Sequence, residues 1–307
     1  MSMRVIFLGT AGSVPTNARS LPAVLIKRLD EQLMFDCGEG VQRQMIKAKV
    51  GFHKKMKIFI SHMHGDHVLG LLGLLQTMAL MNRQRKVDVY GPEGLKRFFE
   101  DAREVLQFCL TFDVEIHEVH DAGIVCDDED YTVEATEANH VITGWAYALV
   151  EKPRPGKFYP EKARALGIPE GELWSRLQHG ECVKLPNGKV VRPSEVIGPP
   201  RQGRKIVYTG DTRPFDGFAD FAANADLVIH DATFDDTLVD KADLDGHSTP
   251  SQAAQQAAKA NAKKLVLTHI SARYADTAIL LEQAQKIFRD VLVAEDFMEL
   301  ELPLLDS

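Results

Sequence analysis

The 307-residue sequence has few cysteines, no long apolar segment and no overall excess of positive charge. Its four cysteines form no Cys-x-x-Cys pair, so we expect small apolar side chains in a reducing compartment. The longest apolar region, residues 68–81, is too short to span a bilayer, and the apolar start is too short for a signal peptide. The net charge of −8 restricts any nucleic-acid contact to a local surface. We therefore expect a cytoplasmic protein without a membrane partner.

The sequence does contain a dense run of metal-ligand side chains at residues 61–70, SHMHGDHVLG. His62, His64, Asp66 and His67 lie within six residues, and imidazole and carboxylate groups this close suit a divalent metal such as zinc. A short apolar strand is expected before the run and an apolar helix after it, so the ligands would follow the carboxyl end of a strand. Because a glycine turn separates them, His62 and His64 can face one metal, and Asp66 and His67 can face a second metal. A loop of solvated histidines is the alternative.

Short apolar runs that stop at turn residues predict strands along the whole chain. Five of these strands end at a histidine or an aspartate: His62, His140, Asp211, His230 and His269. One such end means little, but a set of them indicates that one rim of a sheet, or of two packed sheets, carries a ring of ligands. Strands and helices also recur as two similar halves. We therefore expect the α/β class, with helix–sheet–sheet–helix layers.

Three further residues with ligand side chains were assigned from their local context. Asp36 follows a predicted strand and precedes a glycine turn and a helix. We interpret it as a carboxylate that orients metal-ligand histidines, with helix capping as the alternative. His117 and His120 lie in and just after an alternating, half-exposed strand, so we expect them to be surface histidines.

Residues 151–205 differ from the rest of the chain in composition and charge. They are rich in proline and glycine, and their twelve Lys and Arg against six Glu give a charge of +6, which leaves −14 for the remainder. A basic arm on an acidic body suits a polyanionic partner held away from the ligand rim. A solvated surface insertion is the alternative.

Taken together and in their order along the chain, the sequence motifs resemble those of the metallo-β-lactamase superfamily. The resemblance is closer to one of its families, the ribonuclease Z family of tRNA 3′-processing endonucleases. The resemblance covers essentially the whole chain. Its segments are FLGTAGSVPT, FDCGEG, SHMHGDHVLG, Asn139-His140, YTGDTRP, HDAT from His230, HST from His247, and LTHISARY. It implies a metallo-β-lactamase αββα sandwich over residues 1–307, interrupted at 151–205 by a protruding flexible arm that binds precursor tRNA. It also implies a homodimer in which the arm of one subunit binds tRNA for the other.

The resemblance further implies two Zn²⁺ ions per subunit, with Mn²⁺ or another divalent metal possible. One ion would be held by His62, His64 and His140, the other by Asp66, His67 and His269, and Asp211 would bridge them. A hydroxide activated by the two metals would attack phosphorus just after the discriminator nucleotide and leave a 3′-hydroxyl. Asp66 would also orient or deprotonate this nucleophile, and His247, oriented by Asp231, would protonate the leaving oxygen. Arg273 and Arg213 would contact phosphate or form structural ion pairs, and His230 would be structural.

Two questions stay open at this point. Residues 15–20 read PTNARS where the family has Pro-x-Lys-x-Arg-Asn, so the treatment of transcripts that already encode CCA is not determined. The HxHxDH core also occurs in thioesterases, lactonases and small phosphodiesterases of the superfamily. The basic arm and the HST and SARY segments favour RNA over these substrates. The full ligand set disfavours a catalytically silent tRNA-binding protein with structural metals.

Overall fold

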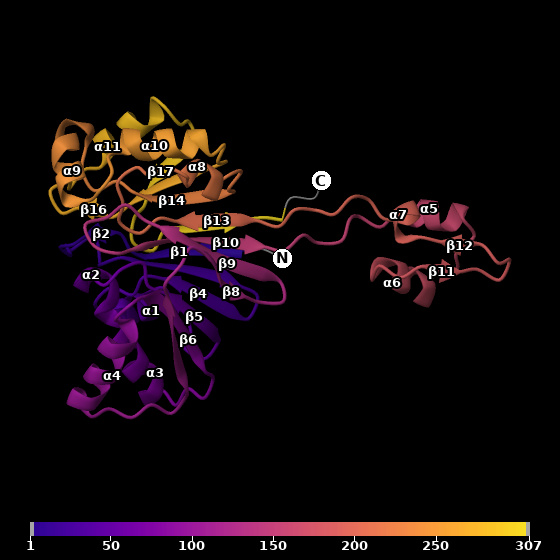
Figure 1. Cartoon of the computed structure of the whole chain (residues 1–307), viewed down its shortest axis with the longest axis horizontal. Coiled ribbons are helices and arrows are strands. Elements are labelled where there is room, and N and C mark those ends of the chain that lie inside the picture. Colours follow the sequence, from indigo (N-terminus) through magenta and orange to yellow (C-terminus); the bar gives the residue numbers. More distant parts are fainter. Residues whose placement is uncertain (1–2, 305–307) are drawn as a thin grey trace. The chain divides into compact units, whose positions relative to one another are not determined.

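The computed structural model describes residues 3–304, which form two compact units (Figure 1). The larger unit comprises the chain up to Val150 together with Arg204–Pro303, and the smaller unit is built from Glu151–Gly203. The sequence delimited the insertion as 151–205. Lys205 instead begins a strand of the larger unit, because its backbone pairs with Val150.

Two seven-stranded mixed sheets form the centre of the larger unit. The first sheet has the order β18 (Glu299–Leu302), β1 (Met3–Gly9), β3 (Ala23–Arg28), β4 (Glu31–Phe35), β5 (Lys55–Phe59), β6 (Val87–Pro92) and β7 (Val114–Val119). The second has the order β17 (Val291–Val293), β15 (Leu265–Thr268), β14 (Leu227–Asp231), β13 (Lys205–Tyr208), β10 (Trp145–Glu151), β9 (Tyr131–Glu137) and β8 (Gly123–Asp127). Strands β4 to β7 are parallel to one another, as are β13, β14, β15 and β17.

The strand sequences bury both faces of each sheet. In β1, Val5 and Phe7 point into a core shared by the two sheets, whereas Ile6 and Leu8 point to the opposite face. The shared core also contains Tyr147 of β10, so the two sheets pack face to face. Because side chains alternate along a strand, a run of consecutive apolar residues is what a strand covered on both faces requires.

Helices cover the outer face of each sheet (Figure 1). Over the first sheet lie α1 (Val41–Lys47), α3 (Gly70–Leu80) and α4 (Leu95–Leu106); over the second lie α8 (Phe218–Phe221), α10 (Pro250–Lys259) and α11 (Ala278–Gln285). The predicted α/β class and αββα layering are therefore confirmed.

Two local features differ from the sequence-based expectation. The helix expected over residues 68–81 is α3, and a separate short helix, α2 (Gly65–Val68), precedes it within the ligand run. At their junction a Cβ on Gly70 would lie 2.0 Å from the Gly38 carbonyl oxygen, and the Gly70 N–H donates to the Cys37 carbonyl. Strand β8 was not predicted, because it is short, lies at a sheet edge and has only one buried residue, which leaves a weak apolar signal.

The smaller unit has an apolar core of its own. Its elements are α5 (Pro160–Ala165), α6 (Glu172–Gln178), β11 (Val183–Lys184), β12 (Val190–Val191) and α7 (Pro193–Val196). Ala163, Leu177 and Val191 are buried together in it. Among residues 3–304, no helix has the length and apolar character needed to cross a bilayer.

Candidate metal centre

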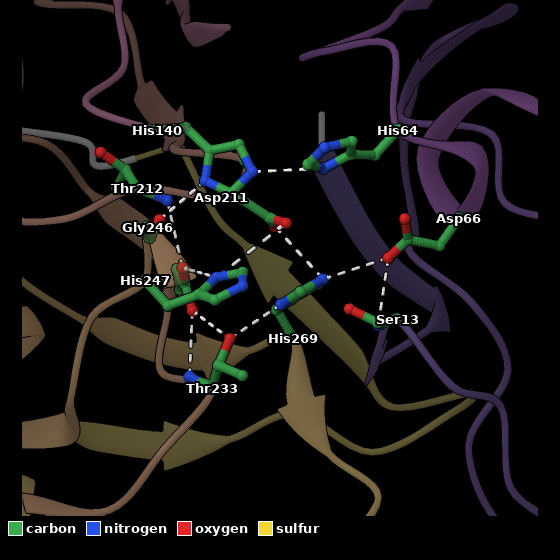
Figure 2. A network of polar contacts seen from close by, with 12 residues as sticks. Ser13, His64, Asp66, His140, Asp211, Thr212, Thr233, Gly246, His247 and His269 are labelled. Carbon is green, nitrogen blue, oxygen red and sulfur yellow. Dashed lines mark hydrogen bonds and ion pairs between the residues drawn. The ribbon is translucent and has the colours of Figure 1, made fainter. Parts of the chain in front are cut away.

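Four of the five predicted strand-end residues lie together at one rim of the larger unit. Figure 2 shows three of them, His140, Asp211 and His269. His62 follows β5, Asp211 follows β13 and His269 follows β15. His140 lies between β9 and β10, and an isolated backbone bridge between His62 and Gly144 joins that segment to the end of β5. The rim is thus built at the carboxyl ends of parallel strands from both sheets, which is where open α/β sheets place ligands.

One group of potential ligands consists of His62, His64, His140 and Asp211. The Nδ1 atom of His64 lies 3.0 Å from Nε2 of His62 and 3.2 Å from Nε2 of His140. Asp211 Oδ2 lies 3.6 Å from His62 Nε2. Three imidazole nitrogens and one carboxylate oxygen therefore face a common point.

A second group consists of Asp66, His67, His269 and, again, Asp211. His67 Nε2 lies 3.4 Å from His269 Nε2 and 3.3 Å from Asp211 Oδ2. His269 Nε2 lies 3.4 Å from Asp66 Oδ2 and 3.3 Å from Asp211 Oδ1. Asp211 thus lies between the two groups and presents one oxygen to each of the neighbouring histidines His67 and His269. The two groups are those that the sequence separated on either side of the glycine turn.

Hydrogen bonds outside the centre fix the ring orientation of His62 and His67. The Asp36 carboxylate accepts from His67 Nδ1 at 2.6 Å and from the Ser61 hydroxyl at 2.8 Å. Because the Ser61 hydroxyl donates to Asp36, its oxygen accepts from His62 Nδ1, at 2.9 Å. Tyr208 also donates to Asp36, at 2.6 Å. Both rings therefore carry Nδ1–H and turn Nε2 inward, and in the neutral form the lone pair of Nε2 faces the centre.

The same pattern holds for the two histidines of the second sheet. The Gly246 carbonyl can only accept, so His140 Nδ1 donates to it, at 2.7 Å. The Thr233 hydroxyl donates to Asp231, and its oxygen therefore accepts from His269 Nδ1, at 2.8 Å. Nε2 of each ring is again left as the inward-facing acceptor.

This set of donors fits divalent metal ions. Neutral imidazole nitrogens and carboxylate oxygens are the ligands that zinc and related metals take. Asp211 is buried, and among the described residues its Oδ1 atom has no hydrogen-bond donor. Burial of an ionised carboxylate is costly unless hydrogen bonds, a paired charge or a metal ion compensate it. The alternative of a helix-capping role for Asp36 does not fit, because α1 begins after Gly40 without a side-chain cap.

Burial and neighbouring charges act in opposite directions on the pKa values of the ligands. Burial lowers the pKa of His62 well below its usual value, which keeps the imidazole neutral. Burial would also lower the pKa of His67, but the carboxylates of Asp211 and Asp36 raise it well above the usual value. Asp211 is buried too, yet the neighbouring His269 and His67 lower its pKa. The centre therefore favours ionised carboxylates, the form that binds a metal cation.

His247 lies beside the centre (Figure 2) and was not among the predicted ligands, although with Asp211, Asp231 and His269 it forms a third group of potential ligands. Its Nδ1 donates to Asp231 Oδ2 at 2.8 Å, and its ring stacks on His269 at 5.1 Å between centroids. Burial lowers the pKa of His247, but the charge and hydrogen bond of Asp231 outweigh burial and raise it to about 9. Asp231 is itself held by the backbone N–H groups of Thr212 and Thr233. The imidazole is thus oriented and favours the protonated form at neutral pH.

The remaining predicted residues lie farther from the ligands. His230 is fully buried and stacks edge-on against Phe218 under α8, so its side chain points away from the rim. It does not join the ring of ligands that its strand end suggested. On β14, the next residue, Asp231, faces the rim instead, because adjacent side chains point to opposite faces.

The two arginines have different surroundings. The Arg213 guanidinium bonds to backbone oxygens of Asp243, at 2.5 Å, and Leu244, and its Nε lies 3.3 Å from the Asp243 carboxylate. Of the two predicted roles, this geometry favours the structural ion pair. Arg273 is exposed and lies over the Phe234 ring, at 4.8 Å, and Phe234 in turn contacts the ring of His247.

Several residues of the site were not singled out by the sequence. The Ser13 N–H donates to Asp66 Oδ2 at 3.0 Å, and Ser61, Thr233 and Gly246 hold the histidines as described. Two of these contacts are made by the backbone, for which the residue type gives no signal. Only the position of Ser61 directly before the first histidine could have pointed to it. His117, half-buried against Tyr90 and bonded to Asp88, and the exposed His120 lie outside the site.

Comparisons with known proteins agree with this geometry. A family model for the anti-Pycsar protein Apyc1 matches residues 3–150, and a β-lactamase superfamily domain model matches residues 188–270. The crystal structure of the short form of human tRNase Z is 31% identical, with a TM-score of 0.72, and the match covers 98% of this chain and 99% of that one.

Curated relatives match over the full length. Ribonuclease Z from Methanosarcina acetivorans is 47% identical over 302 residues, which is 98% of each chain. Ribonuclease Z from Haloferax volcanii is 46% identical over 309 residues, covering 100% of this chain and 97% of the relative. At this identity and coverage, the chain belongs to the ribonuclease Z family of the metallo-β-lactamase superfamily.

Proposed function

We propose that the protein is a metal-dependent endoribonuclease that removes the 3′ trailer of precursor tRNA. It cuts after the discriminator nucleotide and leaves a 3′-hydroxyl. The observation that carries this proposal is the pair of ligand groups that share Asp211, in a chain 47% identical to a ribonuclease Z. A site with two adjacent metal positions suits hydrolysis of a phosphodiester.

The two groups would hold two Zn²⁺ ions per subunit, although Mn²⁺ or another divalent ion has compatible ligands. One ion would take His62, His64 and His140, the other Asp66, His67 and His269, with Asp211 between them. When bound, such ions supply positive charge to the scissile phosphate and lower the pKa of an attacking water.

Two side chains supply the proton transfers. Asp66 is held toward the centre by the Ser13 N–H, and its carboxylate can orient the attacking water and accept a proton from it. His247, fixed through Nδ1 by Asp231, can donate a proton to the leaving 3′ oxygen. Asp36 and Asp231 act through the imidazoles that they orient.

The smaller unit supplies the basic surface for the RNA. Arg164 and Arg176 are paired with acidic residues within this unit, at 2.7 and 2.8 Å, so they contribute less free charge than the count suggests. Lys157, Lys184 and Lys189 are exposed and can contact phosphates. We propose that this arm binds precursor tRNA, that the protein is a cytoplasmic homodimer, and that the arm of one subunit serves the centre of the other.

The test is cleavage of a 3′-extended precursor tRNA by the full-length protein. We expect one cut after the discriminator nucleotide, its loss in a chelator and its recovery with Zn²⁺. His64→Ala should reduce the rate by at least about 100-fold, because a metal contributes several kcal/mol to the transition state. His120→Ala removes an exposed histidine outside the site and should leave the rate unchanged.

Cleavage that persists after chelation, or in His64→Ala, would contradict a metal-dependent reaction at this centre. A protein that hydrolyses only a small diester such as bis(p-nitrophenyl) phosphate, and no precursor tRNA, would instead be another hydrolase of the superfamily.

A further inference from the structure

The loop of residues 10–20 touches two members of the metal centre. The Ser13 N–H donates to Asp66 Oδ2 at 3.0 Å (Figure 2). The short strand β2 (Ala11–Gly12) pairs with β16 (Ile270–Ser271), directly after His269. A Cβ on Gly12 would lie 2.7 Å from the His269 carbonyl oxygen and 3.0 Å from its Nδ1. The position of this loop therefore sets the positions of both Asp66 and His269.

The tip of this loop is not held by burial. Residues 13–18 are exposed, and Ser13 adopts a left-handed backbone conformation with φ of 53°. Left-handed backbone is unfavourable for a serine by roughly 1–2 kcal/mol, so surrounding contacts must maintain it. These contacts include the Ser13–Asp66 bond, the Thr16–Arg19 turn and the bonds at the two ends of the loop.

A single carboxylate, Asp296, binds both ends. Its Oδ1 accepts from the Thr10 hydroxyl at 2.8 Å, and its Oδ2 accepts from the Ser20 backbone N–H at 2.8 Å. Asp296 lies between β17 and β18, near the other end of the chain. It closes the loop from a position more than 270 residues away in sequence.

Two further side chains connect this carboxylate to the body of the unit. Gln44 of α1 donates through Nε2 to Asp296 Oδ2 at 2.9 Å and to the Leu8 carbonyl of β1 at 2.7 Å. Arg19 donates to the Thr10 hydroxyl oxygen at 2.7 Å and to the Ala294 carbonyl at 2.5 Å. The loop ends are thus tied to a helix and to both sheets.

We propose that Asp296 is a positioning residue of the metal centre, which acts through the loop of residues 10–20 on Asp66 and His269. Its hydrogen bonds go to Thr10, Ser20 and Gln44, and none of these is a predicted metal ligand. Backbone bonds from Ala11 to Ser20 and from Ile270 to Thr10 would still hold the loop, but removing the acceptor oxygens of Asp296 would loosen both loop ends and widen the motion of Gly12 and Ser13 beside the two ligands. The proposal requires a metal site at these residues and does not depend on which diester is cut.

The test compares Asp296→Asn with Glu295→Gln, which removes the same charge from the exposed neighbouring residue. The asparagine amide cannot accept from Ser20, Thr10 and Gln44 together. In the metal-free protein, hydrogen exchange of the Ala11 and Ser13 amides should accelerate at least about tenfold in Asp296→Asn, because local opening is no longer opposed. Zn²⁺ affinity, measured by competition with a chelator, should fall about 10- to 100-fold. Glu295→Gln should match the wild type in both measurements.

Turnover of bis(p-nitrophenyl) phosphate distinguishes a role of Asp296 in positioning the metal centre from a role in the stability of the fold alone. A positioning role lowers kcat per bound Zn²⁺ in Asp296→Asn at saturating Zn²⁺, whereas a structural role alone would lower only the folded fraction. If Asp296→Asn does not fold, Thr10→Val removes one end of the clamp with an isosteric side chain and should show a smaller shift of the same sign.

Unchanged exchange and unchanged Zn²⁺ affinity would overturn the proposal. Because neither measurement uses RNA, its failure is distinct from that of the ribonuclease assignment, which would appear as no cleavage of precursor tRNA by the wild type.

Discussion

Gly246 shows how closely single residues are fitted to the metal-ligand histidines. Its carbonyl accepts from His140 Nδ1, its backbone has a φ of +86°, and an added Cβ would lie 2.6 Å from that same nitrogen. Gly217 has nearly the same φ, +85°, but within the described part of the chain an added Cβ would meet no atom within 4 Å. Comparing substitutions at Gly246 and Gly217 therefore distinguishes the cost of a left-handed backbone from the effect of a steric contact with His140.

We expect Gly246→Ala and Gly217→Ala each to lower the free energy of unfolding by about 1–2 kcal/mol, the cost of left-handed backbone. Only Gly246→Ala should also weaken Zn²⁺ binding, because its methyl group displaces the His140 ring. Denaturant unfolding and chelator competition measure the two effects. Equal Zn²⁺ affinities in both variants would show that His140 tolerates the displacement.

The role of His247 can be separated from metal binding. Its Nδ1 is bonded to Asp231, and it lies outside the predicted ligand set. His247→Ala should lower kcat on precursor tRNA by about 10²- to 10⁴-fold, as expected when a general acid is lost. Bound metal, measured by atomic absorption, should stay constant.

A substrate whose leaving group needs no proton provides the control for His247. The p-nitrophenolate of bis(p-nitrophenyl) phosphate is a weak base, so His247→Ala should slow its release far less than it slows cleavage of precursor tRNA. Similar losses on both substrates would assign His247 to another task, such as metal or substrate binding.

At the scale of residues, the sequence indicated the candidate ligands more readily than the groups that hold them in place. His62, His64, Asp66 and His67 lie within six residues, so their side-chain types alone indicated a metal site. Residues such as Ser13 and Gly246 position the ligands through backbone groups, so their side-chain types gave no signal in the sequence. His230 and Asp231 are adjacent in β14, and their side chains point to opposite faces of the sheet. The end of an apolar run in the sequence does not show which of the two side chains faces the metal centre.

At the scale of elements, a buried lysine ties the two sheets together. Lys57 on β5 donates to the Asp128 carboxylate and to the Tyr131 hydroxyl, both at 2.6 Å. Those two partners belong to the second sheet and its β8–β9 turn. Lys55, on the same strand and facing the same way, also binds Asp128, at 2.8 Å, but its side chain is 51% exposed against 7% for Lys57.

The two lysines should therefore differ in their contribution to stability. We expect Lys57→Met to lower the free energy of unfolding by about 1–3 kcal/mol, because it leaves buried acceptors without a donor. Lys55→Met should cost less than about 1 kcal/mol, as exposed ion pairs do. Denaturant unfolding measures both changes. If the two variants lose the same stability, burial does not set the strength of this contact.

The layers were predictable from the sequence because consecutive apolar residues in strands such as β1 demand cover on both faces. The break between α2 and α3 was not predictable in the same way. It depends on the approach of Gly70 to the Gly38 backbone, a contact across 32 positions that leaves no trace in local periodicity. The same holds for Asp296, whose partners lie at the opposite end of the chain.

At the scale of the whole molecule, the arm is inserted between two paired strands. Val150 of β10 lies opposite Lys205 of β13 in an antiparallel pair, so a short turn can join the strands when the arm is removed. The apolar core of the arm is also separate from the cores of the larger unit. Its removal should therefore leave the metal centre intact.

Replacing residues 152–203 with Asn-Gly should preserve Zn²⁺ binding and hydrolysis of bis(p-nitrophenyl) phosphate. Cleavage of precursor tRNA should fall by at least about 100-fold in kcat/KM and should depend less on salt, because fewer phosphates are contacted. Steady-state kinetics over a range of salt concentrations measures both. Parallel loss on the small diester and the tRNA would show that the arm supports the fold of the larger unit.

Mixing two defective proteins tests whether the arm acts across a dimer. The armless protein keeps an intact centre, and full-length His64→Ala keeps an intact arm. If the arm of one subunit serves the centre of the other, a heterodimer of the two contains one working pair, and the mixture should recover cleavage that neither protein shows alone. Native mass spectrometry verifies that heterodimers have formed. Heterodimers without activity would place the arm and the centre that it serves in the same chain.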